Sequence, residues 1–181
     1  MKTVLEINLQ SLEYNFNKIK SLVKPTTKTM AVVKANAYGS GMIAVAKKLN
    51  KLGVDYFSVA YAKEGVELRN AGIKTPILVL IPQTGSFDKI TNFDLEPSIY
   101  SFHFLNEFIK YAQKKNISNY PIHFKINSGL NRIGFKEEEI EKAFESASNS
   151  NRFFIKSIYS HLSASEDLNE KEFTLQQIKS F

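Results

Sequence analysis

Hydrophobic and polar residues follow two periods along this chain, and the two periods take turns from end to end. Short apolar or alternating runs predict strands over 3–7, 28–33, 56–60, 77–81, 95–100, 122–126 and 153–159. Between them, apolar residues recur every three or four positions and predict helices. The first helix follows Asn8, which can cap it, and carries Leu12, Phe16 and Ile19 on one stripe. Further helices are expected over 45–52, 61–71, 101–112 and 136–147 and from residue 170 onward.

This alternation predicts an α/β fold with a parallel sheet, because each crossover helix returns the chain to the same end of the sheet. Six β/α units follow the leading strand and begin near residues 28, 56, 77, 95, 122 and 153. A complete (β/α)8 barrel of the TIM type has eight units and about 250 residues. The 181 residues therefore predict one domain, either an open doubly wound sheet or part of a barrel. Periodicity alone does not separate these two.

Composition and charge narrow the range of functions. No apolar run is long enough to span a membrane, and the first residues lack the apolar core of a secretory signal, so a cytoplasmic protein is expected. The net charge of +6 comes mainly from scattered lysines, which favours a solvated surface over nucleic-acid binding. The absence of cysteine excludes disulfides and thiolate metal sites, and no histidine or carboxylate pair has metal-ligand spacing, so no metal is expected.

A lysine ends the apolar run that begins at Met30. Residues 30–33 predict a buried strand, Lys34 follows at its carboxyl end, and a short turn with Gly39 and Gly41 then opens a helix. Burying a charged amine is costly unless it is paired or neutralised, so Lys34 either marks the point where the strand leaves the core or belongs to a site. A partly desolvated lysine amine at a strand end can attack an aldehyde.

Two later strand ends carry further candidates. Arg132 lies between two glycines in the loop after the strand 122–126, where its guanidinium suits a carboxylate or phenolate, although an ordinary loop with an exposed arginine has the same pattern. His161 follows the strand 153–159 and precedes small polar residues. The other histidines, His103 and His123, lie in no such motif and are interpreted as surface or structural residues.

The sequence resembles the alanine racemase family at these three strand ends. Residues 31–39, Ala-Val-Val-Lys-Ala-Asn-Ala-Tyr-Gly, match the family signature nearly residue for residue. Residues 126–134, Ile-Asn-Ser-Gly-Leu-Asn-Arg-Ile-Gly, are similar to the family's Val-Asp-Thr-Gly-Met-x-Arg-x-Gly, with Asn127 in place of the aspartate. Residues 160–163, Ser-His-Leu-Ser, correspond to its Thr-His-Phe/Leu-Ala/Ser. The resemblance favours the barrel over the open sheet.

The resemblance implies a role for each matched residue. Lys34 would form the Schiff base with pyridoxal 5'-phosphate (PLP) and serve as the base on one face of the substrate. Tyr38 would contact the cofactor phosphate, and His161 would lie behind the pyridine ring. Arg132 would bind the phenolic oxygen and the substrate carboxylate. Lys125 occupies the position of a lysine that is carbamylated in many members and holds that arginine.

The resemblance also implies an activity, which is the interconversion of L- and D-alanine that supplies D-alanine for peptidoglycan. Residues 1–181 would be the N-terminal PLP-binding barrel domain of a homodimer, truncated to about six β/α units. The family's second base is a tyrosine from a C-terminal β domain, so we expect this chain to be inactive alone. The alternatives are a non-enzymatic PLP carrier of the single-domain barrel type and a structural fragment without a competent pocket.

Overall fold

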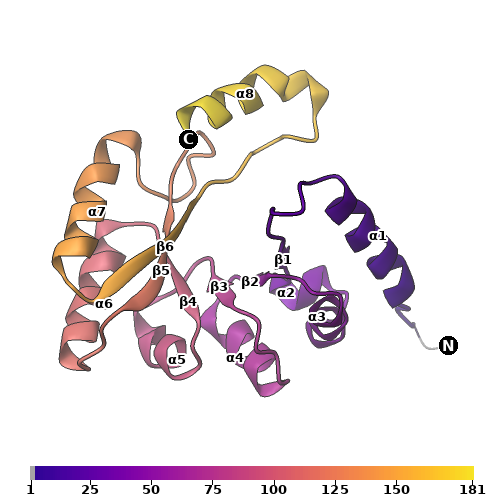
Figure 1. Cartoon of the computed structure of the whole chain (residues 1–181), viewed down its shortest axis with the longest axis horizontal. Coiled ribbons are helices and arrows are strands. Elements are labelled where there is room, and N and C mark those ends of the chain that lie inside the picture. The colour runs from indigo at the N-terminus through magenta and orange to yellow at the C-terminus, as the bar shows by residue number, and fades with distance from the viewer. Residues whose placement is uncertain (1–2) are drawn as a thin grey trace. The chain divides into compact units, whose positions relative to one another are not determined.

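The computed structural model describes residues 3–181 and divides them into two compact units. The first unit holds the residues up to Pro82 together with Asp88–Glu96, and the second holds Gln83–Phe87 and Pro97–Phe181. Figure 1 shows the elements in chain order, coloured from indigo to yellow. Helix α5 (Phe87–Asn92) and strand β4 (Glu96–Ile99) contribute residues to both units.

Three parallel strands form the sheet of the first unit. Met30 of β1 lies opposite Tyr56 of β2, and Phe57 of β2 lies opposite Ile77 of β3. The elements of this unit are α1 (Leu9–Ser21), β1 (Met30–Val32), α2 (Lys34–Tyr38), α3 (Met42–Lys51), β2 (Tyr56–Val59), α4 (Ala62–Asn70) and β3 (Ile77–Val79). The stripe of apolar residues on α3 is buried together with the side chains of β2 and β3, and these residues form the core of the unit.

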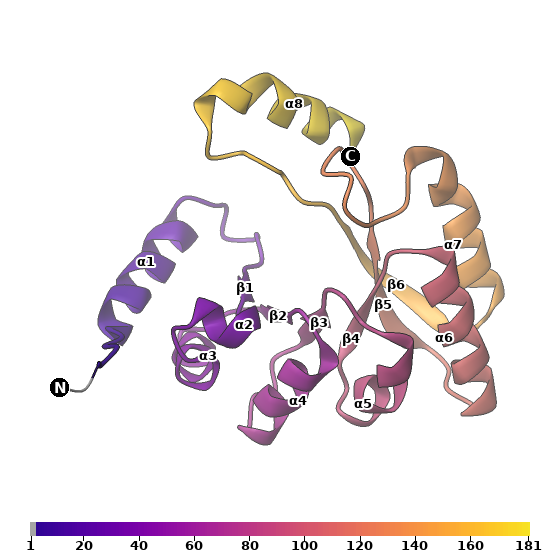
Figure 2. The ribbon, with the colours of Figure 1, turned by 180° about the vertical axis from the view of Figure 1, so that it is seen from behind.

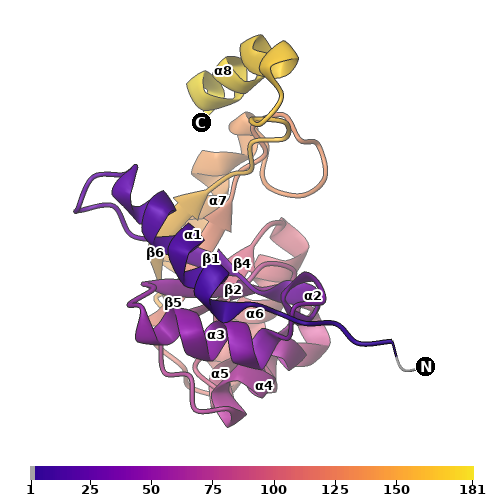
Figure 3. The ribbon, with the colours of Figure 1, turned by 90° about the vertical axis from the view of Figure 1, so that its right-hand side faces the viewer.

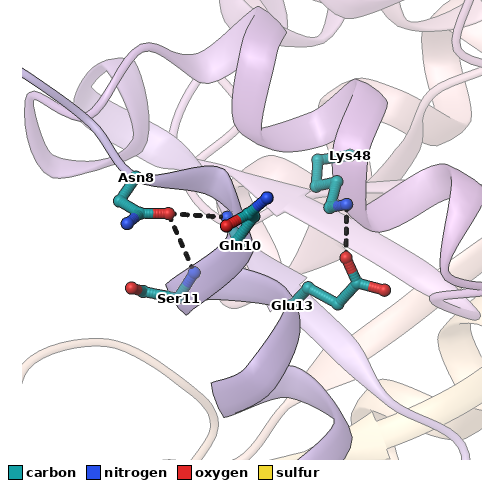
Figure 4. Close-up of polar contacts among 5 residues, drawn as sticks. All are labelled: Asn8, Gln10, Ser11, Glu13 and Lys48. Atoms are coloured by element: carbon teal, nitrogen blue, oxygen red, sulfur yellow. Dashed lines mark hydrogen bonds and ion pairs between the residues drawn. The ribbon is translucent and has the colours of Figure 1, made fainter.

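Helix α1 is capped at its start by Asn8 and is joined to α3 by an ion pair (Figure 4). The side-chain oxygen of Asn8 accepts hydrogen bonds from the backbone amides of Gln10 and Ser11, which would otherwise be unpaired at the helix start. Glu13 of α1 pairs with Lys48 of α3 and joins the two helices. The predicted cap and helix are confirmed.

The second unit contains the longer strands and the larger helices. Strand β5 (Tyr120–Lys125) pairs in parallel with β4 and with β6 (Phe153–Tyr159). Figure 2 shows α6 and α7 side by side next to these strands, and Figure 3 shows α8 beside the loop that follows β5. The remaining elements are η1 (Thr84–Ser86), α6 (Phe102–Lys114), η2 (Glu137–Glu139), α7 (Ile140–Asn149), η3 (Leu168–Glu170) and α8 (Lys171–Ser180).

The predicted alternation of strands and helices is confirmed, with three corrections. Residues 3–7 form no strand, and the structure pairs them with none of the strands in residues 3–181; Val4 and Leu5 are both exposed. Strand β1 is not fully buried, because Met30 and Val32 are 43% and 42% exposed. The sequence analysis missed η1 and α5, which are too short to show a helical period.

Two structural features that would indicate particular functions are absent from residues 3–181. None of the helices described there combines the length and the hydropathy that a membrane crossing requires. Across the same residues, the side chains of histidine, aspartate and glutamate form no group of three that could hold a metal ion.

Candidate active site

Lys34 follows β1 at the point where the main chain leaves the sheet. The amide of Val33 still donates to the carbonyl of Ser58 on β2 at 2.9 Å, and the Val33 side chain is buried. Lys34 itself is half-buried and begins α2. The strand therefore delivers the lysine to the carboxyl end of the sheet, where β/α proteins place their functional groups.

Four consecutive residues after Lys34 have a left-handed backbone. Ala35, Asn36, Ala37 and Tyr38 have φ angles of 50°, 54°, 52° and 54°. The left-handed region costs an L-residue other than glycine about 1–2 kcal/mol, so a run of four is held by its surroundings. The sequence analysis predicted a short turn here, and the structure shows a strained one.

Hydrogen bonds fix this turn at both of its ends. The Ala37 amide donates to the Val33 carbonyl at 2.9 Å, and the side-chain oxygen of Asn36 accepts from the Met42 amide at 2.8 Å. The second bond ties the turn to the first residue of α3. Tyr38 remains 68% exposed, so its hydroxyl is available to a ligand. Strained segments of this kind cluster at functional sites.

Lys125, in the second unit, is the last residue of β5 and is only 4% exposed. Its Nζ donates to the Ile126 carbonyl at 3.1 Å and to Ser160 Oγ at 3.4 Å, and it lies 5.2 Å from the centre of the Tyr159 ring. Burial and, to a lesser degree, the charge of Arg132 lower the pKa of Lys125 to about 8. Burial raises the pKa of the Tyr159 hydroxyl to about 12, so Tyr159 stays neutral. Lys125 is thus a buried amine that readily loses its proton.

The loop that carries Arg132 is closed by its own backbone. The Phe135 amide donates to the Lys125 carbonyl, and the Asn127 amide donates to the Phe135 carbonyl, both at 2.9 Å. Gly134 makes this closure possible: its φ is 118°, and a Cβ there would lie 2.9 Å from the backbone of residues 125–127. Arg132 is held on this closed loop with its side chain exposed.

The side chain of Asn127 organises the first half of the same loop. Its Oδ1 accepts from the amides of Gly129 and Asn131 at 3.2 and 2.9 Å, and its Nδ2 donates to Asn131 Oδ1 at 2.9 Å. An aspartate could accept the two backbone bonds but could not donate to Asn131. Asn127 therefore keeps the backbone arrangement that an aspartate would give and adds one bond of its own.

His161 follows β6 and is exposed. Its carbonyl accepts from Nε2 of Gln177 on α8 at 3.2 Å, and Oε1 of Gln177 accepts from the Ser163 amide at 3.0 Å. Gln177 is fully buried and so fixes the segment after His161. Ser160, next to His161, contacts Lys125 and Ser128. The second unit thus places Lys125 at the carboxyl end of β5, Arg132 in the loop that follows it, and His161 directly after Ser160, which contacts Lys125.

The structure adds residues that sequence analysis did not single out as site residues. In the second unit these are Gln177 and Ser160, and in the first unit Glu64, whose carboxylate contacts the backbone next to Lys34. Single polar side chains leave no periodic signal in the sequence, so only their contacts in the structure reveal them. His103 is exposed on α6, and His123 is buried with its Nδ1 2.6 Å from Ser157 Oγ, which agrees with surface and structural roles.

Comparison with known proteins decides the family. The model of the alanine racemase N-terminal domain matches residues 7–181. The chain belongs to the alanine racemase family. Alanine racemase 1 of Caldanaerobacter subterraneus subsp. tengcongensis is 37% identical over 182 residues, which cover 99% of this chain and 46% of that protein. The alanine racemase of Thermodesulfovibrio yellowstonii is 38% identical over 179 residues, covering 97% of this chain and 47% of that protein.

Solved structures identify the fold as well as the family. An alanine racemase structure from Clostridium difficile 630 superposes with a TM-score of 0.90 at 32% identity, covering 99% of this chain and 48% of that one. The fold is therefore the N-terminal barrel of alanine racemases, of which residues 3–181 form six parallel strands with their helices. The chain spans about half the length of the curated relatives it matches.

The lowered pKa of Lys125 gives a testable pH dependence. In protein labelled with ¹³C at lysine Cε, we expect one resonance to titrate near pH 8, while ordinary lysines titrate near 10.5. Lys125→Arg assigns that resonance by removing it. Arg132→Ala should raise the Lys125 pKa, because it removes a neighbouring positive charge. If every lysine titrates above pH 10, the buried environment described for Lys125 is wrong.

The lowered pKa of Lys125 also makes the stability of the folded protein depend on pH. The folded state favours the neutral amine, so the contribution of Lys125 to the free energy of unfolding is fully present above pH 10.5 and is lost as the pH falls through about 8.

Proposed function

We propose that residues 1–181 are the N-terminal PLP-binding barrel domain of an alanine racemase and take part in the PLP-dependent interconversion of L- and D-alanine. The observation that carries the proposal is Lys34, a half-buried amine at a strand end, followed by a strained turn that hydrogen bonds hold in place. Strain of this kind has a functional rationale when an adjacent group must be held in one direction.

The donor set suits PLP. The aldehyde of PLP reacts with an amine, and Lys34 in the first unit supplies one. The phosphate requires hydroxyl or amide donors, and Tyr38 lies exposed near the start of α3, a ten-residue helix whose first amides favour an anion. In the second unit, Arg132 suits the phenolic oxygen and the substrate carboxylate, and His161 suits one face of the ring. PLP held by these residues would supply an electron sink that makes the α-proton of alanine easier to remove.

The chain's own residues would orient the substrate and move its proton. The Lys34 amine serves as the base that removes or returns the α-proton on one face of the substrate. The Arg132 guanidinium holds the substrate carboxylate through paired N–H donors. The closed loop of residues 125–135 fixes the backbone from which the Arg132 side chain extends.

Lys125 is the proposed site of a carbamate. The neutral amine attacks carbon dioxide, an N–C bond forms, and one proton is released, which converts a buried amine into an anion. A pKa of about 8 supplies the neutral amine at a much higher fraction than an ordinary lysine would. The anion would attract Arg132, whose positive charge already acts on Lys125. An aspartate at position 127 would add a second anion there, and Asn127 does not.

Residues 1–181 by themselves are proposed not to racemise alanine, because they supply a base for one face only. In the family the base for the other face comes from a tyrosine outside the barrel domain, reached across a homodimer. The whole enzyme would then be a cytoplasmic homodimer that supplies D-alanine for peptidoglycan.

A chimera tests the proposed function. Residues 1–181 would replace the matched segment of the Clostridium difficile racemase, and D-alanine formed from L-alanine would be measured by chiral chromatography. We expect the chimera to racemise alanine, its Lys34→Ala variant to lose that activity, and isolated residues 1–181 to form no D-alanine. A folded, PLP-binding chimera without activity contradicts the racemase proposal and favours the PLP-carrier alternative.

A further inference from the structure

Glu64 joins the loops that follow two neighbouring strands of the first unit. It lies in the first turn of α4, directly after β2. Its Oε1 accepts from the Ala35 amide at 2.7 Å, and its Oε2 accepts from the amides of Ala60 and Tyr61 at 2.7 and 3.1 Å. One carboxylate thus receives three backbone amides from two separate β/α loops. Bonds of this charge-assisted kind are stronger than those between neutral groups.

Helix capping explains only part of this arrangement. Tyr61 is the N-cap residue of α4, and its backbone amide donates to Glu64 Oε2 in a capping-box contact. This bond stabilises the start of α4. The bond from Ala35 is no part of a cap, because Ala35 lies 29 residues earlier in the turn after Lys34. Glu64 therefore uses one oxygen for its own helix and the other for the lysine turn.

The bond to Ala35 acts on Lys34 through the peptide plane. The Ala35 amide belongs to the planar peptide unit that also contains the Lys34 carbonyl. Fixing that amide fixes ψ of Lys34 and hence the direction in which its Cα–Cβ bond leaves the strand. Ala35 is also the first of the four left-handed residues, so the same bond holds the strained turn at its start.

We propose that Glu64 is a positioning residue that aims Lys34 by fixing the Ala35 amide to the end of β2. The inference deepens the proposed function and rests on it for the role of Lys34. In the protein without cofactor we also expect the Ala35 amide to be protected from hydrogen exchange, because Glu64 Oε1 accepts a hydrogen bond from it.

Glu64→Gln separates positioning from capping. A glutamine side chain has one acceptor oxygen and one NH2 group, so in either orientation an NH2 donor faces a backbone N–H donor. Keeping the oxygen on Ala60 and Tyr61 preserves two bonds, and the bond to Ala35 is then lost. Glu64→Asp is the second variant, because its shorter side chain cannot span both loops. Glu67→Gln is the matched control, since Glu67 is exposed on the same helix and its change in charge is identical.

The test measures amide hydrogen exchange without PLP and the affinity for PLP by titration. In Glu64→Gln we expect exchange in the peptide containing Ala35 to be about tenfold faster, with protection at Ala60 and Tyr61 retained, and PLP affinity about tenfold weaker. Glu67→Gln should change neither. Unchanged exchange at Ala35 in both Glu64 variants overturns the inference. Failure of the wild-type chain to bind PLP refutes the proposed function instead, and the exchange result still decides the contact of Glu64 with the turn.

Discussion

Replacing Lys34 with alanine is expected to abolish the attachment of PLP that survives borohydride reduction. The reason is chemical: among side chains, an amine forms the adduct with the PLP aldehyde that borohydride reduces to a stable bond, and Lys34 is the amine at the carboxyl end of β1, directly before the turn of residues 35–38. The measurement is the mass of the reduced protein and of its peptides. A loss of at least about 100-fold in label on the peptide containing residue 34 is expected, since no other nucleophile lies at that position.

Lys47→Ala provides the matched control for Lys34→Ala. Lys47 is an exposed lysine on α3, in the same unit as Lys34, so its removal changes net charge equally and leaves the turn intact. We expect Lys47→Ala to retain the label. Equal labelling of wild-type, Lys34→Ala and Lys47→Ala would mean that PLP reacts with surface lysines at random.

Replacing Phe108 with alanine is expected to destabilise the second unit by about 3–5 kcal/mol, the usual cost of deleting a fully buried aromatic ring. Phe108 is 0% exposed on α6, and its ring is stacked on that of Phe153 of β6 at 4.8 Å between centroids. Four further rings lie within 6.2 Å of it, those of Phe87, Phe104, Tyr111 and Tyr120. The ring therefore joins the helix layer to the sheet that positions Lys125 and Arg132.

Denaturant unfolding followed by circular dichroism measures the Phe108→Ala effect. Phe154→Ala is the control, because Phe154 is the next residue on β6 and its side chain is 40% exposed. We expect the control to lose about 1 kcal/mol or less. A loss below about 1 kcal/mol for Phe108→Ala as well would contradict the packing of the Phe108 ring between the helix layer and the sheet.

Most helices and strands could be predicted because each depends on a hydrophobic pattern within its own few residues. The run of residues 153–159 gives β6 with the predicted bounds, and the helix predicted over 101–112 is α6, which Ser101 caps. Residues 3–7 show the limit of that reasoning. They have an apolar pattern, yet a strand also needs a partner, and pairing depends on residues far away in the chain.

Of the candidate site, only the residues with reactive or binding side chains could be predicted from the sequence. The motifs indicated Lys34, Tyr38, Arg132 and His161, but the left-handed turn was not predictable, because alanine and tyrosine have no preference for positive φ. Glu64 was missed because its pattern resembles an ordinary helix start.

The measurement that tests the central claim most directly is a PLP titration of wild-type residues 1–181, followed by borohydride reduction and mass mapping of the modified lysine. We expect saturable binding with about one PLP per chain, all of it on Lys34. Label that is absent, or spread over many lysines without saturation, would contradict the claim that β1 and the turn after it form a PLP site.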